Sequence, residues 1–246
     1  MKNTKAPYDS IATWYDEQVR SLPLTETLIL PHLPQLLGNV AASSVCDLGC
    51  GQGVVSRWLA EQSATVVGVD LSSALLAIAQ RYENDQPLEI TYQQDNAESL
   101  TTLHDESFDG LICNLALMDM ADLTAVFTAV FRVLKQGGWF IFSLTHPCFQ
   151  TPNAYWQHLE DGQINRVITG YFEEGFWRSD NPRGVRGQVG AYHRTLSTYL
   201  NTLVAAGFHF EQMLEPQAKP DIVEQLSGYN YVPAFMIMRA QKRATM

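Results

Sequence analysis

The stretch Val45-Cys46-Asp47-Leu48-Gly49-Cys50-Gly51-Gln52-Gly53 decides the fold class of this chain. An apolar run over Ser44 to Leu48 predicts a buried strand, and three alternate glycines follow it. Apolar residues then continue at helical spacing from Val54 to Leu59. A strand, a glycine turn and a helix in this order let a ligand lie against bare backbone at the helix N-terminus. Many α/β folds share such a turn, so the stretch predicts the fold class more specifically than the ligand.

The same alternation continues along the chain. Further β-rich runs predict strands over 64–69, 88–92, 108–113 and 139–145, with helical apolar periods over 72–82 and 123–134. Gly137-Gly138 is expected to end the second of these helices. Strands that alternate with helices predict a mostly parallel sheet covered by helices on both faces. Ligands of such sheets bind at the carboxyl ends of the strands.

The remaining segments divide the chain into four parts. Residues 1–40 are expected to form an N-terminal helical cap interrupted by prolines, and residues 41–146 the α/β core. Residues 147–192 have many Gly, Pro and Asn breaks but also many aromatic residues, so we interpret them as an inserted substrate cap after the fifth strand. Residues 193–246 are expected to complete the core with a helix that ends at Gly207 and two strands, over 208–214 and 231–238.

Composition excludes several classes of protein. The chain has 246 residues, of which 46% are hydrophobic, as expected for a globular protein with a sizeable core. The net charge of −10 disfavours nucleic-acid binding. We see no apolar run of membrane-spanning length and no secretory signal. The four cysteines form no CxxC pair and have no zinc spacing, so we expect no metal and a reducing cytoplasmic setting; the oligomeric state stays open.

Acidic residues lie at or just after the ends of three of the predicted strands. Asp47 would repel a pyrophosphate at the glycine turn and attract a cofactor that carries an ammonium and a sulfonium group. The spacing also departs from the dinucleotide pattern, whose third glycine would fall at Val54. Asp70 can accept the hydrogen bonds of both ribose hydroxyls. Asp95, with Asn96 and Ala97, can bind an adenine amino group. Asp47 and the glycine spacing together disfavour a nicotinamide-dependent reductase.

Taken together, these motifs resemble the class I S-adenosylmethionine-dependent methyltransferases, specifically their small-molecule branch with the type-11 domain. The glycine stretch matches the family's first motif, and Asp70 and Asp95 match its ribose-side and adenine-side acids. The segment Leu134-Lys135-Gln136-Gly137-Gly138 matches the helix end before the fifth strand, and Ile11 to Asp16 resembles the leading helix. The resemblance implies a Rossmann-like, seven-stranded, mostly parallel sheet with one antiparallel strand near its end.

The resemblance also implies a function and a set of contacts. The implied activity is methyl transfer from S-adenosyl-L-methionine to a small-molecule acceptor by in-line displacement, leaving S-adenosyl-L-homocysteine. A protein that only binds these nucleosides is the alternative. Residues 114–117 lack the Pro-Pro-aromatic motif of DNA amino-group methylases. The cofactor contacts expected from the motifs and the resemblance are Tyr15, Asp47, Gly49, Gly51, Gly53, Asp70, Leu71, Asp95, Asn96, Ala97, Asn114 and Leu115.

A catalytic base is required only if the acceptor must lose a proton to become nucleophilic. His146 ends the fifth predicted strand, and His193 precedes the last predicted helix, so both are candidate bases. Each can equally be a structural histidine that orients the cap. Cys148 has no supporting motif for covalent catalysis and is expected to be a packed thiol.

The acceptor is expected to contact the inserted cap. Tyr171, Trp177 and Arg194 are the predicted substrate contacts. Residues 136–218 contain five arginines and no lysine, and arginine favours carboxylate or phosphate and stacks on aromatic rings. One hypothesis is an acceptor with an apolar or aromatic body and an anionic group. The other interpretation is that these side chains pack the cap and form ordinary surface ion pairs. The arginines are Arg166, Arg178, Arg183, Arg186 and Arg194.

Overall fold

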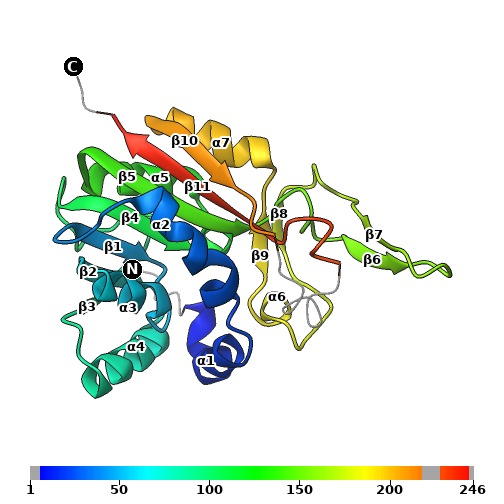
Figure 1. Cartoon of the computed structure of the whole chain (residues 1–246), viewed down its shortest axis with the longest axis horizontal. Coiled ribbons are helices and arrows are strands. Elements are labelled where there is room, and N and C mark those ends of the chain that lie inside the picture. Colours follow the sequence, from blue (N-terminus) through cyan, green and yellow to red (C-terminus); the bar gives the residue numbers. More distant parts are fainter. Residues whose placement is uncertain (1–5, 218–227, 244–246) are drawn as a thin grey trace.

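Seven strands form the central sheet of the computed structural model, which describes residues 6–217 and 228–243 (Figure 1). Their spatial order is β10-β11-β5-β4-β1-β2-β3. All are parallel except β11, which runs antiparallel to both β5 and β10. The strands are β1 (Ser44–Leu48), β2 (Thr65–Asp70), β3 (Thr91–Gln94), β4 (Phe108–Asn114), β5 (Leu134–Thr145), β10 (Phe208–Leu214) and β11 (Phe235–Lys242). The predicted Rossmann-like fold is confirmed.

Helices cover both faces of this sheet. On one face pack α5 (Leu123–Val133) and α7 (Leu196–Ala205), and on the other α2 (Leu33–Leu37) and α3 (Val54–Glu61). The period of two in β5 explains the division, because Phe140 and Phe142 join the first cluster while Trp139 and Ile141 join the second. A strand buried on both faces is therefore apolar throughout, as the sequence of β5 is.

The N-terminal segment lies beside α4 (Ser73–Asp85). It begins with the 3₁₀ turn η1 (Pro7–Ser10) and α1 (Ala12–Ser21), which packs on α4. A π-helical turn η2 (Thr25–Ile29) and a 3₁₀ turn η3 (Leu30–His32) then lead into α2. The described part of the N-terminal segment is thus helical with interruptions, and Pro31 and Pro34 lie where the helical geometry changes.

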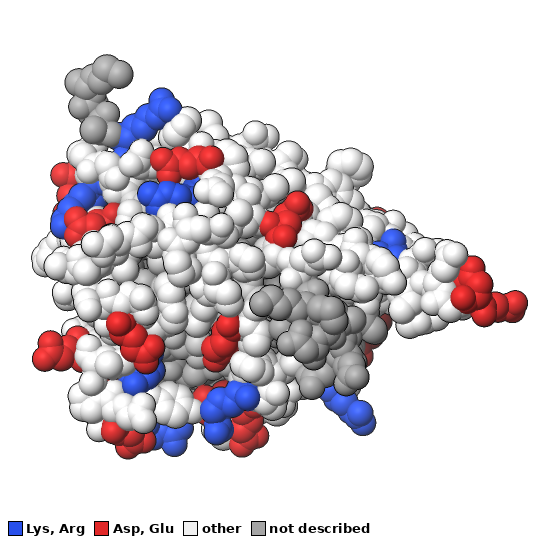
Figure 2. Space-filling model, viewed as in Figure 1, with Lys and Arg blue, Asp and Glu red and all other residues white. Residues whose placement is uncertain are grey.

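The segment 147–192 has two distinct parts. The hairpin of β6 (Tyr155–His158) and β7 (Ile164–Val167) projects away from the sheet (Figure 1). Its tip carries acidic side chains in Figure 2. The second part pairs β8 (Gly175–Trp177) with β9 (Ala191–His193) and includes α6 (Val185–Gln188). Since β9 crosses the expected boundary between residues 192 and 193, this second part is continuous with the chain that completes the core.

Three strands begin at least three residues away from the expected position. The third strand begins at Thr91 rather than at residue 88, because the Glu83 carboxylate accepts hydrogen bonds from the backbone N–H groups of Leu88 and Ile90. The fifth strand begins at Leu134, which pairs with Phe108, so α5 ends before the two glycines. The last strand runs over Phe235–Lys242 rather than 231–238. It follows Pro233, which has no N–H group to donate to a sheet.

Residues 1–5 of the predicted N-terminal cap, and residues 218–227 and 244–246 of the predicted C-terminal part, lie outside the described residues. Among the helices that the structure does describe, none is both long and apolar enough to cross a membrane.

Candidate functional site

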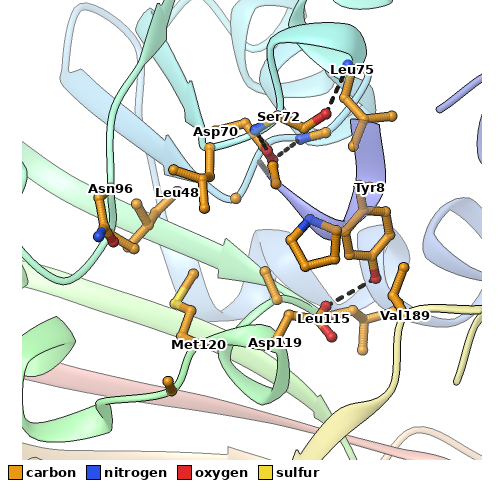
Figure 3. Close-up of a pocket in the computed structure, with 18 of the residues that line it drawn as sticks. Tyr8, Leu48, Asp70, Ser72, Leu75, Asn96, Leu115, Asp119, Met120 and Val189 are labelled. Carbon is orange, nitrogen blue, oxygen red and sulfur yellow. Dashed lines mark hydrogen bonds between the residues drawn. The ribbon is translucent and has the colours of Figure 1, made fainter. Parts of the chain in front are cut away.

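A cavity of about 410 Å³ opens at the carboxyl ends of β1, β2 and β4 (Figure 3). This is the edge at which open α/β sheets bind ligands, and the volume lies in the range of small-molecule sites. Four parts of the chain line it: the N-terminal segment, the core strands' loops, η4 (Leu117–Asp119) and the β8–β9 region. The predicted cofactor residues that line it are Tyr15, Gly49, Gly51, Asp70, Leu71, Asp95, Asn96, Ala97, Asn114 and Leu115.

Asp70 is the last residue of β2 and faces this cavity (Figure 3). Its Oδ2 accepts a hydrogen bond from the N–H of Gly51 at 2.9 Å, and its Oδ1 accepts one from the N–H of Ser72 at 2.8 Å. Each carboxylate oxygen keeps a second lone pair for a ligand hydroxyl. Burial raises the pKa of Asp70, while the two backbone donors act in the opposite direction. The carboxylate is therefore fixed in orientation and open to two further donors.

The three glycines of the first motif have different roles. Gly49 has a φ of +70°, and a Cβ there would lie 2.5 Å from the Cβ of Ala116. The close approach of the loop after β4 therefore requires a glycine at position 49. Gly51, at a φ of +55°, borders the cavity with only Leu75 within 4.0 Å of such a Cβ. At Gly53 the added Cβ would lie 2.3 Å from the Oη of Tyr92. Gly53 therefore makes room for a packed tyrosine and does not line the cavity.

Asp47 lies beneath the glycine turn rather than in the cavity lining. It is 1% exposed, and the hydroxyl of Ser56 donates to its Oδ2 at 2.6 Å. The period of two in β1 gives the reason, since Leu48 faces the cavity while Asp47 shares the opposite face with Val45. Burial raises the pKa of Asp47 to about 7. Direct contact of this carboxylate with a ligand, as expected from the sequence, finds no support in this placement.

Asp95 lines the cavity, but its carboxylate already accepts hydrogen bonds from its own loop. The N–H groups of Asn96 and Thr102 donate to it, each at 2.7 Å, and the hydroxyls of Thr101 and Thr102 add two more. Although burial acts to raise the pKa of Asp95, these donors hold it below its ordinary value. Four donors fill the lone pairs of a carboxylate. Asp95 therefore fixes the loop that presents Asn96 and Ala97 to the cavity.

The loop after β4 is held in a strained conformation beside the cavity. The side-chain oxygen of Asn114 accepts a hydrogen bond from the hydroxyl of Ser143 at 2.6 Å, and its amide donates to Thr25 at 3.2 Å. Leu115 has a φ of +52°, and its N–H donates to the carbonyl of Ser143. Both residues line the cavity, as expected. The strain is thus maintained by contacts to β5 and to the N-terminal segment.

The carboxylate of Asp119, away from Asp70 in the cavity, was not among the residues predicted from the sequence. Asp119 on η4 lines the cavity and accepts a hydrogen bond from the hydroxyl of Tyr8 at 3.0 Å, which is drawn in Figure 3. The guanidinium of Arg186 on α6 donates to its other oxygen. Tyr8 packs edge-on against Tyr15, with ring centroids 5.1 Å apart. The available signal was position, since Asp119 follows the end of β4 as the other acids follow their strands.

Both candidate histidines lie outside the cavity lining. His146 is buried; its Nε2 is 2.8 Å from the Oε1 of Glu215, and its Nδ1 accepts the N–H of Cys148, so the proton is on Nε2. Burial lowers the pKa of His146. The Nε2 of His193 is 2.8 Å from the carbonyl of Tyr171 and donates to it. His146 thus joins the start of the 147–193 segment to Glu215 after β10, and His193 joins β9 to Tyr171 within the segment, in agreement with the structural alternative raised from the sequence.

The three predicted substrate contacts also lie outside the lining. The hydroxyl of Tyr171 accepts the N–H of Leu196 at 2.9 Å, and Trp177 packs on the core. Arg194 is buried and donates to the carbonyls of Leu117, Met120 and Ala121, at 3.4, 2.7 and 2.9 Å. These carbonyls belong to η4 and the residues after it. Arg194 therefore fixes the segment that carries Asp119.

The charged groups of the cavity lining are all acidic among the residues that the structure describes. They are Asp70, Asp95, Glu98 and Asp119. None of the five arginines of residues 136–218, all within the described ranges, belongs to the lining, so they do not support an anionic acceptor. In the described part of the chain no cluster of His, Cys, Asp or Glu has the arrangement of a metal site.

Comparisons with known proteins agree with this geometry. A family model described as a methyltransferase domain matches residues 46–142. The chain is similar to the crystal structure of an S-adenosylmethionine-dependent methyltransferase from Mesorhizobium loti, with a TM-score of 0.75 and 31% identity over 86% of this chain and 96% of that one. The chain belongs to the S-adenosylmethionine-dependent methyltransferases. The comparisons give no support to the alternative of a protein that binds without catalysis.

Two curated relatives match a smaller share of this chain. The ubiquinone biosynthesis O-methyltransferase of Pseudomonas fluorescens is 33% identical over 153 residues, which are 61% of this methyltransferase and 64% of the relative. That of Alkalilimnicola ehrlichii is 31% identical over 153 residues, 61% of each chain. This methyltransferase thus spans less than two thirds of the length of either relative.

The cavity fits the family's cofactor, S-adenosylmethionine. Asp70 keeps two open acceptor positions of the kind that a ribose diol requires. The glycine turn presents bare backbone at Gly51, where a side chain would project into the cavity. Asn96 and Ala97 provide polar and apolar surface beside it. These residues are those that would hold the nucleoside.

Proposed function

We propose that this methyltransferase transfers the methyl group of S-adenosylmethionine to an oxygen atom of a small molecule that enters the same cavity. The observation that carries the proposal is the composition of the lining. One part consists of the expected cofactor residues, and the rest is mostly apolar or aromatic surface from the N-terminal segment, η4 and the cap, with Ser72, Glu98 and Asp119 as its other polar members. The printed names of the curated relatives, which are O-methyltransferases, support oxygen as the acceptor atom.

S-adenosylmethionine supplies a methyl group that is already activated by the positive charge on sulfur. The protein's contribution is then mainly alignment and the exclusion of water. Asp70 and the glycine turn would fix the nucleoside end. Apolar contacts close the other end: Met120, Val189 and Ala191 line the cavity, and Phe176 lies at its edge with 56% of its surface exposed. Burial raises the pKa of Tyr15 to about 12, so its hydroxyl stays protonated and able to donate.

The acidic lining favours a neutral acceptor over an anionic one, because an anion would meet the carboxylates at close range. Nucleic acids are disfavoured as substrates for the same reason and by the net charge of −10. Figure 2 shows Lys and Arg interspersed with Asp and Glu on the face it presents. The four cysteines are all free thiols, which supports a reducing, cytoplasmic location.

Calorimetry and a product assay test this proposal. We expect the pure protein to bind S-adenosylhomocysteine, and Asp70→Asn to weaken that binding about tenfold or more, because the amide offers one acceptor where the carboxylate offers two. Asp85→Asn, the same change on an exposed site of α4, is the control. Formation of S-adenosylhomocysteine is then measured with 4-methylcatechol, 3,4-dihydroxybenzoate and dopamine, which are matched neutral, anionic and cationic phenols. No binding of the nucleoside, or no turnover with any phenol, contradicts the proposed function.

A further inference from the structure

Asp119 is the one acid of the described cavity lining whose surroundings come from three separate parts of the chain. Tyr8 from η1 donates to one carboxylate oxygen and Arg186 from α6 donates to the other, while Asp119 itself follows β4. About a fifth of the surface of its side chain, 22%, remains accessible, and this residue lines the cavity. The carboxylate is thus held in one orientation with a part of its surface open to a ligand.

The location of Asp119 separates it from the groups that would hold the nucleoside. In Figure 3 it lies with Tyr8, Leu115 and Val189, while Asp70 lies with Ser72 and Leu75 at the end of β2. Most of its neighbours in the lining are apolar, including Ala116, Met120 and Ala121. A carboxylate in such surroundings interacts strongly with any group that donates a proton to it.

We propose that Asp119 is the catalytic base that accepts the proton of the acceptor's hydroxyl group. This inference rests on the proposed function and names the acceptor class: a neutral hydroxyl compound, most simply a phenol. As the acceptor oxygen forms its bond to the methyl carbon, the carbon–sulfur bond breaks with its electron pair on sulfur. The hydroxyl proton passes to a carboxylate oxygen of Asp119 and is later released to water.

The charge balance of the pair decides the acceptor class. Asp119 and Arg186 neutralise each other, so a neutral hydroxyl adds no uncompensated charge to the cavity. An anionic acceptor would face Asp70 and Glu98 as well as Asp119, and no cation of the described residues lines the cavity to receive it. An acceptor with an ammonium group would need a carboxylate without a cationic partner beside it, and Asp119 is already paired with Arg186. Each carboxylate oxygen nevertheless retains a lone pair after its bond to Tyr8 or Arg186.

The basicity of Asp119 agrees with this role. Burial raises its pKa above the ordinary value, and the nearby Arg186 and the hydrogen bond from Tyr8 lower it in part. The titratable and charged groups around it are Tyr8, Tyr15, Asp70, Cys113, Arg186 and Tyr199. Arg186 and Arg194 act through Asp119 and η4, so they are positioning residues and not catalytic ones.

The test compares Asp119→Asn with Asp180→Asn, which makes the same change on an exposed residue of the cap. With 4-methylcatechol as acceptor, we expect Asp119→Asn to lower kcat by about 100-fold or more, the usual effect of losing a general base. The KM and the affinity for S-adenosylhomocysteine should change by less than about threefold. Asp180→Asn should match the unmodified enzyme.

Tyr8→Phe provides a second test that keeps the carboxylate. Because the hydrogen bond from Tyr8 lowers the pKa of Asp119, its loss should move the acidic limb of the kcat/KM profile to higher pH. A profile that does not move, or a kcat of Asp119→Asn within about threefold of normal, overturns the role of base. Loss of nucleoside binding in Asp119→Asn also overturns it, since the residue would then belong to the cofactor site. Failure of the unmodified enzyme with every phenol refutes the proposed function itself, and preferred turnover of the anionic or cationic phenol overturns the acceptor class.

Discussion

Replacement of Asp47 by asparagine should change how the stability of the protein depends on pH. Asp47 is buried at the end of β1, and burial raises the pKa of its carboxyl group from 3.8 to about 7. The folded state therefore binds this proton more tightly than the unfolded state does. The resulting stabilisation is complete below the ordinary pKa of 3.8 and is lost as the pH rises toward 7. Asparagine does not titrate and keeps an oxygen for the hydroxyl of Ser56.

The magnitude follows from the two pKa values. A difference from 3.8 to about 7 corresponds to on the order of 4 kcal/mol in the free energy of unfolding. About 3 kcal/mol of this falls between about pH 5 and about pH 9, where the protein can be studied in common buffers. Relative to the unmodified protein, Asp47→Asn should therefore gain about 3 kcal/mol of stability across that interval.

Urea unfolding followed by tryptophan fluorescence at several pH values measures this difference. Asp85→Asn, on an exposed residue at the end of α4, controls for the removal of a charge, and Ser56→Ala should steepen the dependence because the hydrogen bond from Ser56 lowers the pKa of Asp47. If the stabilities of Asp47→Asn and of the unmodified protein change in parallel from about pH 5 to about pH 9, the carboxyl group does not titrate there and the reasoning is refuted.

Three further predictions test the packing of the site. Gly53→Ala should destabilise the protein by about 2–4 kcal/mol in thermal or urea unfolding, because Gly53 has a φ of +89° and an added Cβ would lie 2.3 Å from the Oη of Tyr92. A second substitution, Tyr92→Ala, should recover part of this loss. If the effects of the two substitutions simply add, the clash is not the cause. Arg194→Met should lower both kcat and the melting temperature, since three carbonyls of η4 and the residues after it lose their hydrogen-bond donor. An unchanged kcat would show that the position of Asp119 does not depend on Arg194. His146→Gln should lower the stability of the protein but change kcat by less than about tenfold, with no shift of the pH profile of kcat. A larger loss of kcat together with a shifted pH profile would restore His146 as a candidate base.

Much of the cofactor side was accessible from sequence because its signals are local. A strand, a glycine turn and a helix occupy consecutive residues, and the acids at strand ends are recognised from the strands before them. Ten of the twelve expected residues line the cavity, nine of them from the core and Tyr15 from the leading helix that the family resemblance indicated. The two exceptions have different causes: Asp47 faces away through the period of two in β1, whereas Gly53 makes room for Tyr92, a residue of β3 that is distant in the chain.

The acceptor side was not accessible in the same way. Tyr8, Asp119 and Arg186 are more than 60 residues apart in sequence and have no shared motif, yet they meet through side-chain contacts. Conversely, Tyr171, Trp177 and Arg194 looked suitable by residue type and satisfy packing or backbone groups instead. Arginine count and aromatic content describe what a segment contains, whereas its contacts depend on where the chain returns to the sheet.

The sequence by itself determined the sheet class, the edge at which the cavity lies and the position of Asp70 at that edge, because hydrophobic period and turn glycines act over a few neighbouring residues. Only the tertiary structure decided which charges face the cavity and which arginines are engaged elsewhere. The physical reason is that burial and pairing of a charge depend on groups distant in the chain, as the contact of Asp119 with η1 and α6 shows.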